Sequence, residues 1–453
     1  MTTEQIGQLL GGMALLLLTA NVFGQLAAKL RQPKVVGEIL AGVLFGSALI
    51  GKVFPGFAHD FLGAGTEATD FRQVGLSFVY NMGLLLLMFV SGAAVRNVLG
   101  KENRRQTAWI LGIGTPLPFI LTLIVAPHLP LDSLMGDSGS RSALTLLLCS
   151  AVAVTSIPVI TKIFSDLGIL HTRFASLLLG SAVLEDIALW GVVSVATALA
   201  ASADSTEGVL TDTVAGHVAT NLGYVAVAML VMPHVLRSVG RAKWNLIARN
   251  TPVTWALLVF LGYVAVAGVL DVTLAFAAFL AGFGLIGGIH GTERLRYRAP
   301  VQSITEVAQG LFIPLYFAIV GLKLDFTKTF SLPMLLAFLV GSSAVAIVCG
   351  GLAARLAGFK GLATFNLAIT TNARGGPGIL LASVGYEAGI ISQAFFTTLV
   401  VTAIVTSQIC GLWLDHVLRK GWSLLGETPE EEAAWAAEPD HTDEHDESEA
   451  ILA

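Results

Sequence analysis

Residues 174–200 form an apolar stretch that carries two acidic side chains near its middle. The first part reads Phe174-Ala-Ser-Leu-Leu-Leu-Gly-Ser-Ala-Val-Leu-Glu185-Asp186-Ile-Ala-Leu-Trp190, and no charge follows before Ala200. A bilayer core about 30 Å thick needs ~20 mostly apolar helical residues per crossing, so the stretch predicts a transmembrane helix. Carboxylates cost about 2.5–3.5 kcal/mol at the centre of such a helix and are functional candidates for that reason.

The rest of the chain has the same apolar character. Of 453 residues, 55% are hydrophobic and only 13% are charged, whereas soluble domains carry roughly 25% charged residues. An ordinary soluble enzyme of this length is therefore excluded. The formal net charge of -5 leaves no basic excess for phosphates, which argues against a nucleic-acid partner.

Thirteen apolar stretches are long enough to cross a bilayer, which predicts an all-α polytopic membrane protein. Their approximate bounds are 6–28, 35–53, 74–95, 107–127, 142–164, 174–200, 213–236, 252–270, 272–289, 303–322, 332–354, 361–385 and 390–414.

The basic residues predict the orientation of these spans. Alternate loops hold 20 of the 26 Lys and Arg residues, and cytoplasmic loops are the ones that collect such cations. The pattern predicts a multi-pass protein, in a cell or inner membrane, with its N-terminus outside and its C-terminus in the cytoplasm. Five cations lie in the other loops and Arg374 lies inside a span; the five are Lys52, Arg72, Arg141, Lys323 and Lys328.

The C-terminal segment differs from the membrane part, residues 1–426. Residues 427–453 hold 11 carboxylates and no Lys or Arg, while residues 1–426 hold 26 basic and 20 acidic residues, a formal charge of +6. The segment predicts a disordered cytoplasmic tail. It is either a solvated terminus or a regulatory, partner-binding segment.

The sequence predicts no cofactor. It contains neither a dinucleotide-binding glycine motif after a strand nor a Walker sequence. Cys149, Cys349 and Cys410 lie far apart in apolar runs, so they suggest neither a disulfide framework nor a metal motif.

Two spans are predicted to be broken rather than continuous. The fifth contains Val154-Thr155-Ser156-Ile157-Pro158, and the twelfth contains Thr370-Thr-Asn372-Ala-Arg374-Gly-Gly-Pro-Gly378. A proline removes a helix hydrogen bond, and irregular backbone at that depth is tolerated only against protein or a water-filled cavity. Transporters use interrupted helices at corresponding positions of two inverted repeats to build an ion site at the midplane. Here the repeats would be spans 1–6 and 8–13, around a linking span 7.

The adjacent acids of the sixth span suggest cation and proton exchange. Successive helical residues point ~100° apart, so one carboxylate can line a water-filled cavity while the other turns towards a cationic partner. The nearness of the two carboxylates favours a proton on one of them, which a cation could replace. Thr155 and Ser156 offer hydroxyl or backbone oxygens to a dehydrated cation.

Four segments resemble signatures of the monovalent cation:proton antiporter superfamily, in particular its Kef-type and plant CHX-type branch. The resemblance covers about residues 5–415 and departs from the pattern at Ser47, where the family commonly has proline. The segments are Val36-Gly-Glu38-Ile-Leu-Ala-Gly-Val-Leu-Phe-Gly-Ser47, Val154-Thr-Ser-Ile-Pro-Val-Ile160 with Leu167-Gly-Ile-Leu170, Ala182-Val-Leu-Glu-Asp-Ile-Ala188, and Phe312-Ile-Pro-Leu-Tyr-Phe-Ala-Ile-Val-Gly-Leu-Lys323.

The resemblance implies the sodium/proton antiporter fold, a homodimer and roles for the charged residues. Asp186 takes the position that binds the transported cation or proton, and Glu185 the variable position before it. The family's acidic first residue tends to pair with a lysine in the eleventh span, yet residues 332–354 contain no Lys or Arg. Arg374, two residues after Asn372 in the broken span, is the nearest substitute by topology, and Lys323 is the next.

The resemblance also implies a division of the membrane part. A moving core bundle would comprise about residues 107–200 and 332–414, and a dimerisation or scaffold part about residues 6–95 and 252–322. Glu38 matches the second-span signature and either lines a cytoplasmic funnel or is a plain interfacial residue.

We therefore expect a secondary antiporter, not an enzyme, that exchanges Na+ or K+ for protons by alternating access. A sodium-coupled symporter for an organic anion is a second hypothesis, although it has little need for an acid pair. A membrane sensor that signals through the acidic tail is a third.

Overall fold

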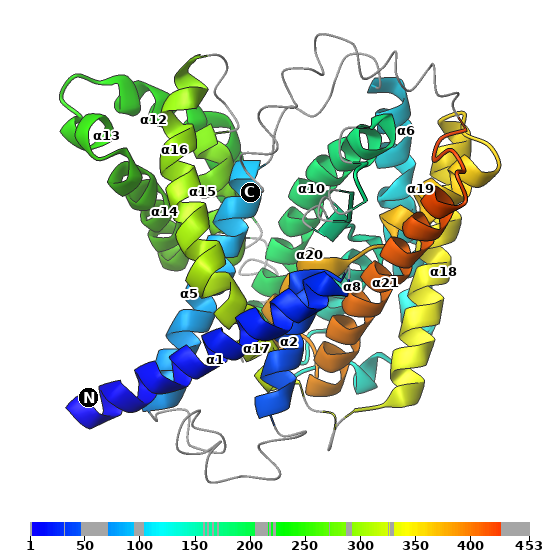
Figure 1. Ribbon diagram of the computed structural model, residues 1–453, viewed down its shortest axis with the longest axis horizontal. Coiled ribbons are helices and arrows are strands. Elements are labelled where there is room, and N and C mark those ends of the chain that lie inside the picture. The colour runs from blue at the N-terminus through cyan, green and yellow to red at the C-terminus, as the bar shows by residue number, and fades with distance from the viewer. Residues whose placement is uncertain are drawn as a thin grey trace. The chain divides into compact units, whose positions relative to one another are not determined.

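In the part of the chain that the computed structural model describes, the regular secondary structure is helical (Figure 1). These residues are 2–30, 32–46, 71–94, 104–156, 159–160, 163–164, 167–169, 172–203, 216, 219–220, 223–270, 272–286, 292–324, 326 and 330–426. Pro158, the side chain of Asp186 and the acidic segment 427–453 lie outside them.

The predicted all-α, multi-pass fold class is confirmed. Within the described residues, eight helices are long and apolar enough to cross a membrane, and three further apolar helices are shorter. No β-strand occurs in these ranges, although an isolated antiparallel bridge joins Met135 to Ile391. The count of thirteen spans and the inverted repeats stay predictions.

The chain forms two compact units, each built from two separate segments. Unit 1 comprises Met1–Val95 and Ser205–Phe330, and unit 2 comprises Arg96–Asp204 and Ser331–Ala453.

Unit 1 contains nine α-helices and two π-helical turns in its described residues. They are α1 (Thr3–Lys29), α2 (Lys34–Phe45), α5 (Phe71–Ala94), η3 (Val227–Val231), α12 (Met232–Arg241), α13 (Leu246–Asn250), α14 (Pro252–Val269), α15 (Leu274–Ile286), α16 (Thr292–Val307), η4 (Ala308–Phe312) and α17 (Ile313–Lys323).

Glycines allow the helices of unit 1 to approach each other at backbone distance. In the α2–α17 pair, a Cβ at Gly42 would overlap the carbonyl oxygen of Ala318, and one at Gly321 would overlap the carbonyl of Ile39. The α5–α15 pair uses Gly92 and Gly282 in the same way. Small residues at such crossings let membrane helices gain close packing, which stabilises them in lipid.

The seventh and tenth predicted spans contain a π-helical turn just before a proline. η3 precedes Pro233, and η4 precedes Pro314. Because proline has no N–H and its ring crowds the preceding turn, a widened turn accommodates it within a continuous helix. The tenth helix also begins earlier than predicted: helical residues run from Thr292 instead of residue 303, because the charged segment before the bilayer stretch is itself helical.

Unit 2 contains the elements on which the broken spans lie. They are α6 (Arg104–Gly114), α7 (Pro116–Val125), η1 (Ala126–His128), η2 (Leu131–Ser133), α8 (Arg141–Ala153), α10 (Arg173–Ala203), α18 (Leu332–Leu356), α19 (Leu362–Thr371), α20 (Gly375–Glu387) and α21 (Gln393–Arg419).

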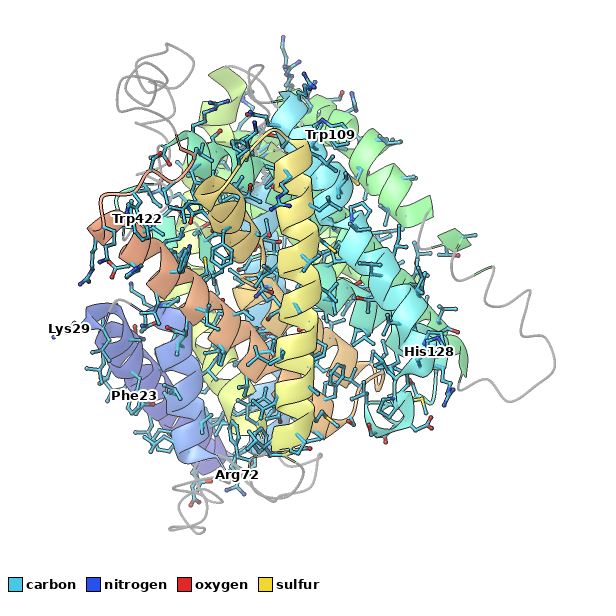
Figure 2. The ribbon with its side chains drawn as sticks, turned by 90° about the vertical axis from the view of Figure 1, so that its right-hand side faces the viewer. Phe23, Lys29, Arg72, Trp109, His128 and Trp422 are labelled. Atoms are coloured by element: carbon cyan, nitrogen blue, oxygen red, sulfur yellow. The ribbon has the colours of Figure 1, made fainter. Side chains whose placement is uncertain are left out.

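In unit 2, α18 and α10 each pack against several other helices. α18 lies against α6, α19 and α21, and α10 lies against α6 and α8. Figure 1 shows the yellow α18 beside the orange α21. Figure 2 shows Trp109 and Trp422 towards one end of this unit and His128 towards the other. Buried residues such as Phe164, Phe174 and Leu367 form its core near the end that carries Trp422.

Two loops of unit 2 are joined by backbone hydrogen bonds at the opposite end. Gly136 N donates to Ile390 O at 3.0 Å, and Ser392 N donates to Leu134 O at 2.9 Å. These bonds tie the segment before α8 to the segment between α20 and α21. The two broken spans are thereby fixed to each other at one end of the unit.

Candidate functional site

The fifth span is broken, as predicted, although the break begins before the proline. α8 ends at Ala153, and Val154 is extended, with φ -68° and ψ 135°. The chain resumes a helical turn after Ser156, whose Oγ accepts a hydrogen bond from Val159 N at 3.3 Å and whose carbonyl accepts one from Ile160 N at 3.0 Å. Ser156 therefore acts as the cap of the second half of the span.

The twelfth span is broken as well. α19 ends at Thr371, α20 begins at Gly375, and Asn372, Ala373 and Arg374 connect them. The glycines and the proline predicted this break because they disfavour a continuous helix.

The two breaks contact each other through hydrogen bonds. Ser156 N donates to Ala373 O at 2.7 Å, and Thr155 Oγ1 donates to Thr371 O at 2.8 Å. Each bond satisfies a polar group that the interrupted helices would otherwise leave unpaired in an apolar environment. Thr155 and Thr371, which are 216 positions apart in the sequence, thus help to join the two breaks. We call this contact between the two broken spans the crossing.

Gly375 makes this close approach possible. Its φ is +34°, a conformation that disfavours side chains, and a Cβ there would lie 2.7 Å from Ser156 Oγ and overlap the side chain of Val159. The crossing therefore depends on a glycine at this position.

α10 brings a carboxylate to this crossing. Glu185 is only 5% exposed, and the hydroxyls of Thr155 and Thr115 lie beside its carboxylate. Among the described residues, its Oε1 has no hydrogen-bond partner. Asp186 is the next residue of the same helix, on a face about 100° away.

Arg374 is buried, and its guanidinium is contacted by neutral groups. Its Nη1 donates to Ser342 Oγ of α18 at 2.7 Å and its Nη2 to Asn372 Oδ1 at 3.3 Å, while the guanidinium lies 5.7 Å from the centre of the Phe338 ring. Glu185 and Arg374, both described, form no ion pair, so the predicted pairing between them is wrong for this structure. The prediction failed because nothing in the sequence indicates that α18 supplies a hydroxyl and a ring face to the guanidinium.

Glu38 and Lys323 belong to unit 1. Glu38 is 8% exposed, next to Gly24 of α1, so it is buried within its unit rather than at a surface. Lys323 is the last residue of α17, and its Nζ lies 3.6 Å from the centre of the Tyr80 ring.

The residues that sequence reasoning missed lie mostly on α21 and α18. Thr406 Oγ1 accepts a hydrogen bond from Arg374 N at 3.4 Å, and Ser407 Oγ accepts one from Gly375 N at 3.1 Å. Threonines at positions 398, 402 and 406 recur every four residues, which is a signal for a polar helix face.

Comparison with known proteins agrees with this architecture. Residues 13–420 match the profile of the family described as sodium/hydrogen exchanger, transmembrane. The chain belongs to the sodium/hydrogen exchanger family. The resemblance drawn from the sequence motifs is confirmed, and the proteins that this exchanger is similar to are transporters, not enzymes.

Two bacterial relatives align over nearly their whole length. The exchanger is 25% identical to the Na(+)/H(+)-K(+) antiporter GerN of Bacillus cereus over 401 residues, 88% of this chain and 93% of GerN. It is 24% identical to the Na(+)/H(+) antiporter NhaS4 of Synechocystis over 418 residues, 90% of this chain and 97% of NhaS4.

A solved structure shares the fold. The sodium proton antiporter MjNhaP1 from Methanocaldococcus jannaschii superimposes with a TM-score of 0.62, covering 93% of this chain and all of that one at 14% identity.

Proposed function

We propose that this exchanger carries Na+ or K+ in exchange for protons, with Asp186 as the residue that binds the cation and the proton in turn. The observation that carries the proposal is the crossing of two broken spans, built by Thr155, Ser156 and Ala373, beside the helix that bears Glu185 and Asp186. Irregular backbone inside a transporter is where polar groups become available to an ion.

The chemistry of the crossing suits a dehydrated monovalent cation. The Thr155 hydroxyl donates its proton to Thr371 O, so the lone pairs of its oxygen remain available to accept from a further partner. Such an oxygen can ligate a cation, or accept a hydrogen bond from a protonated carboxyl group. The same hydroxyl lies beside Glu185, so it can serve both the loaded and the protonated state.

We propose that Arg374 supplies a fixed positive charge to this region, with Asn372 orienting it. Neutral partners hold the guanidinium, so its charge is not cancelled by Glu185. A fixed cation near a carboxylate pair lowers the attraction of the site for a second mobile cation.

Alternating access would use the two units. We propose that unit 2, which contains the core-bundle ranges 107–200 and 332–414, moves relative to unit 1, and that unit 1 forms the homodimer. Motion of one packed body is expected because the broken helices and α10 are tied together within unit 2.

The orientation proposed from the cations places the N-terminus outside and the C-terminus in the cytoplasm, in a cell or inner membrane. In that orientation Glu38 lies towards the cytoplasmic side, Lys323 towards the outer end of its helix, and residues 427–453 form a cytoplasmic tail.

Proteoliposomes with an imposed pH gradient test the proposal. The substitution Asp186→Asn should abolish the collapse of the gradient by Na+, K+ or Li+, because an amide cannot take up the proton. Asp132→Asn is the matched control, because Asp132 is an exposed acid that pairs with Arg141 at 2.6 Å in a loop.

Undiminished exchange by Asp186→Asn would remove Asp186 from the mechanism. Comparing Na+, K+ and Li+ in this assay identifies the cation, and repeating it with and without a clamped membrane potential shows whether net charge crosses. GerN is named for both Na+ and K+, so both ions belong in the first experiment.

A further inference from the structure

The broken helix α20 has no capping side chain of its own. Its N-cap position is Arg374, whose side chain makes no capping hydrogen bond. The first N–H groups of a helix have no partner within that helix, and leaving one unpaired in an apolar core is costly. Pro377, in the same turn, has no N–H to satisfy.

A neighbouring helix supplies the missing acceptors. Thr406 Oγ1 accepts from Arg374 N at 3.4 Å, and Ser407 Oγ accepts from Gly375 N at 3.1 Å. Both residues belong to α21, about 30 positions further along the chain. Both are almost completely buried, at 1% and 3% exposure, so water does not replace them.

The two hydroxyls are oriented for this task. Thr406 Oγ1 donates to Thr402 O at 2.9 Å, and Ser407 Oγ donates to Ala403 O at 2.8 Å, both within α21. Since each hydroxyl proton is engaged in α21, the oxygen lone pairs are left to accept from α20. The hydroxyls thus connect a continuous helix to the first turn of a broken one.

The capped turn also supports the opposite side of the crossing. Ala373, one residue before Arg374, accepts the 2.7 Å hydrogen bond from Ser156 N. The segment 371–375 is therefore held on one side by Thr155 and Ser156 and on the other by Thr406 and Ser407. A shift of this segment displaces the oxygens of the fifth-span break.

We propose that Thr406 and Ser407 are positioning residues for cation binding: hydroxyls of α21 cap α20 and thereby fix the crossing that presents oxygens to the ion. This inference rests on the proposed function, because it takes Thr155 and Ser156 as cation ligands. Neither hydroxyl touches the ion. They act by keeping the ligand oxygens pre-arranged, which lowers the cost of binding.

The test measures exchange against cation concentration in proteoliposomes for Thr406→Val and Ser407→Ala. Valine keeps the branched shape and removes the acceptor oxygen. A hydrogen bond contributes about 0.5–1.5 kcal/mol, so the KM for the cation should rise about two- to tenfold for each variant. The maximal rate should change much less, because the titrating carboxylate is untouched.

Thr398→Val is the matched control. Thr398 lies on α21, is fully buried, and donates to Ala394 O at 2.9 Å within the helix. It should leave KM unchanged. Thr406→Ser, which restores an acceptor, should recover most of the KM of the parent protein.

Unfolding temperature separates positioning from folding. If Thr406→Val fails to fold while Thr398→Val folds, the cap is supported, and Ser407→Ala carries the KM measurement. Equal KM values for Ser407→Ala, Thr406→Val and Thr398→Val would overturn the inference. That result is distinct from failure of the proposed function, which would appear as active exchange by Asp186→Asn.

Discussion

Gly375 offers the sharpest test of the crossing, because the residue beside it is a matched control. Gly375 has a φ of +34°, and a Cβ there would lie 2.7 Å from both Ser156 Oγ and Val159 Cβ. Gly376 has a negative φ, and no described atom lies within 4 Å of the Cβ that alanine would add there. The same substitution at two adjacent positions of one helix turn therefore meets opposite surroundings.

Gly375→Ala should lower the free energy of unfolding for two reasons. An L-residue with a left-handed backbone costs roughly 1–2 kcal/mol. Forcing an extra methyl group into a packed site costs typically about 1–3 kcal/mol. The sum for Gly375→Ala is about 2–5 kcal/mol, whereas Gly376→Ala should be neutral or slightly stabilising, by up to ~1 kcal/mol, because alanine favours the helix.

Two measurements check this prediction. Thermal unfolding of the purified protein should show a clear loss of stability for Gly375→Ala and none for Gly376→Ala. In proteoliposomes, Gly375→Ala should also raise the cation KM, because the added methyl group displaces Ser156. Gly375→Ala with the stability and KM of Gly376→Ala would refute the close approach of the two breaks.

Two further predictions concern packing in each unit. Gly42→Ala should destabilise the protein by about 1–3 kcal/mol or more, because the added methyl group meets the backbone carbonyl of Ala318. Gly262→Ala is the control, because the added methyl group at this position of α14 has open space and should not destabilise the protein. Equal unfolding temperatures for the two variants would contradict the α2–α17 contact. Asn366→Ala should lower the free energy of unfolding by about 2–4 kcal/mol. The Asn366 amide accepts a hydrogen bond from Trp413 Nε1 at 2.9 Å and donates one to a carbonyl of the loop after α21 at 3.0 Å, and the substitution leaves both of these groups unpaired. Asn21→Ala, at an exposed position of α1, is its control, and a similar loss there would show that the bridge contributes nothing.

Much of the fold was predictable because the bilayer imposes strong local rules. Helix length and apolar composition located most elements within a few residues, as α14 shows: it was predicted at 252–270 and spans Pro252–Val269. The break in the twelfth span was predictable for the same reason, since Gly375-Gly-Pro-Gly378 cannot continue a helix without cost.

The surroundings of Arg374 were not predictable. The family resemblance suggested Glu185 as its partner, because residues 332–354 contain no Lys or Arg and Arg374 was the nearest substitute by topology. The structure instead gives the guanidinium the hydroxyl of Ser342 and the ring of Phe338, both from α18. A serine and a phenylalanine in an apolar span carry no sequence signal for such a role.

By itself, the sequence determined that the chain is a membrane protein, which spans are broken, and that two adjacent acids lie near the middle of one apolar stretch. Each of these follows from the local composition of a single segment. Only the tertiary structure decided which oxygens meet at the crossing and that Thr406 and Ser407 of α21 cap α20. These contacts join residues from about 30 to more than 200 positions apart, and they depend on how whole helices pack, which no local pattern encodes.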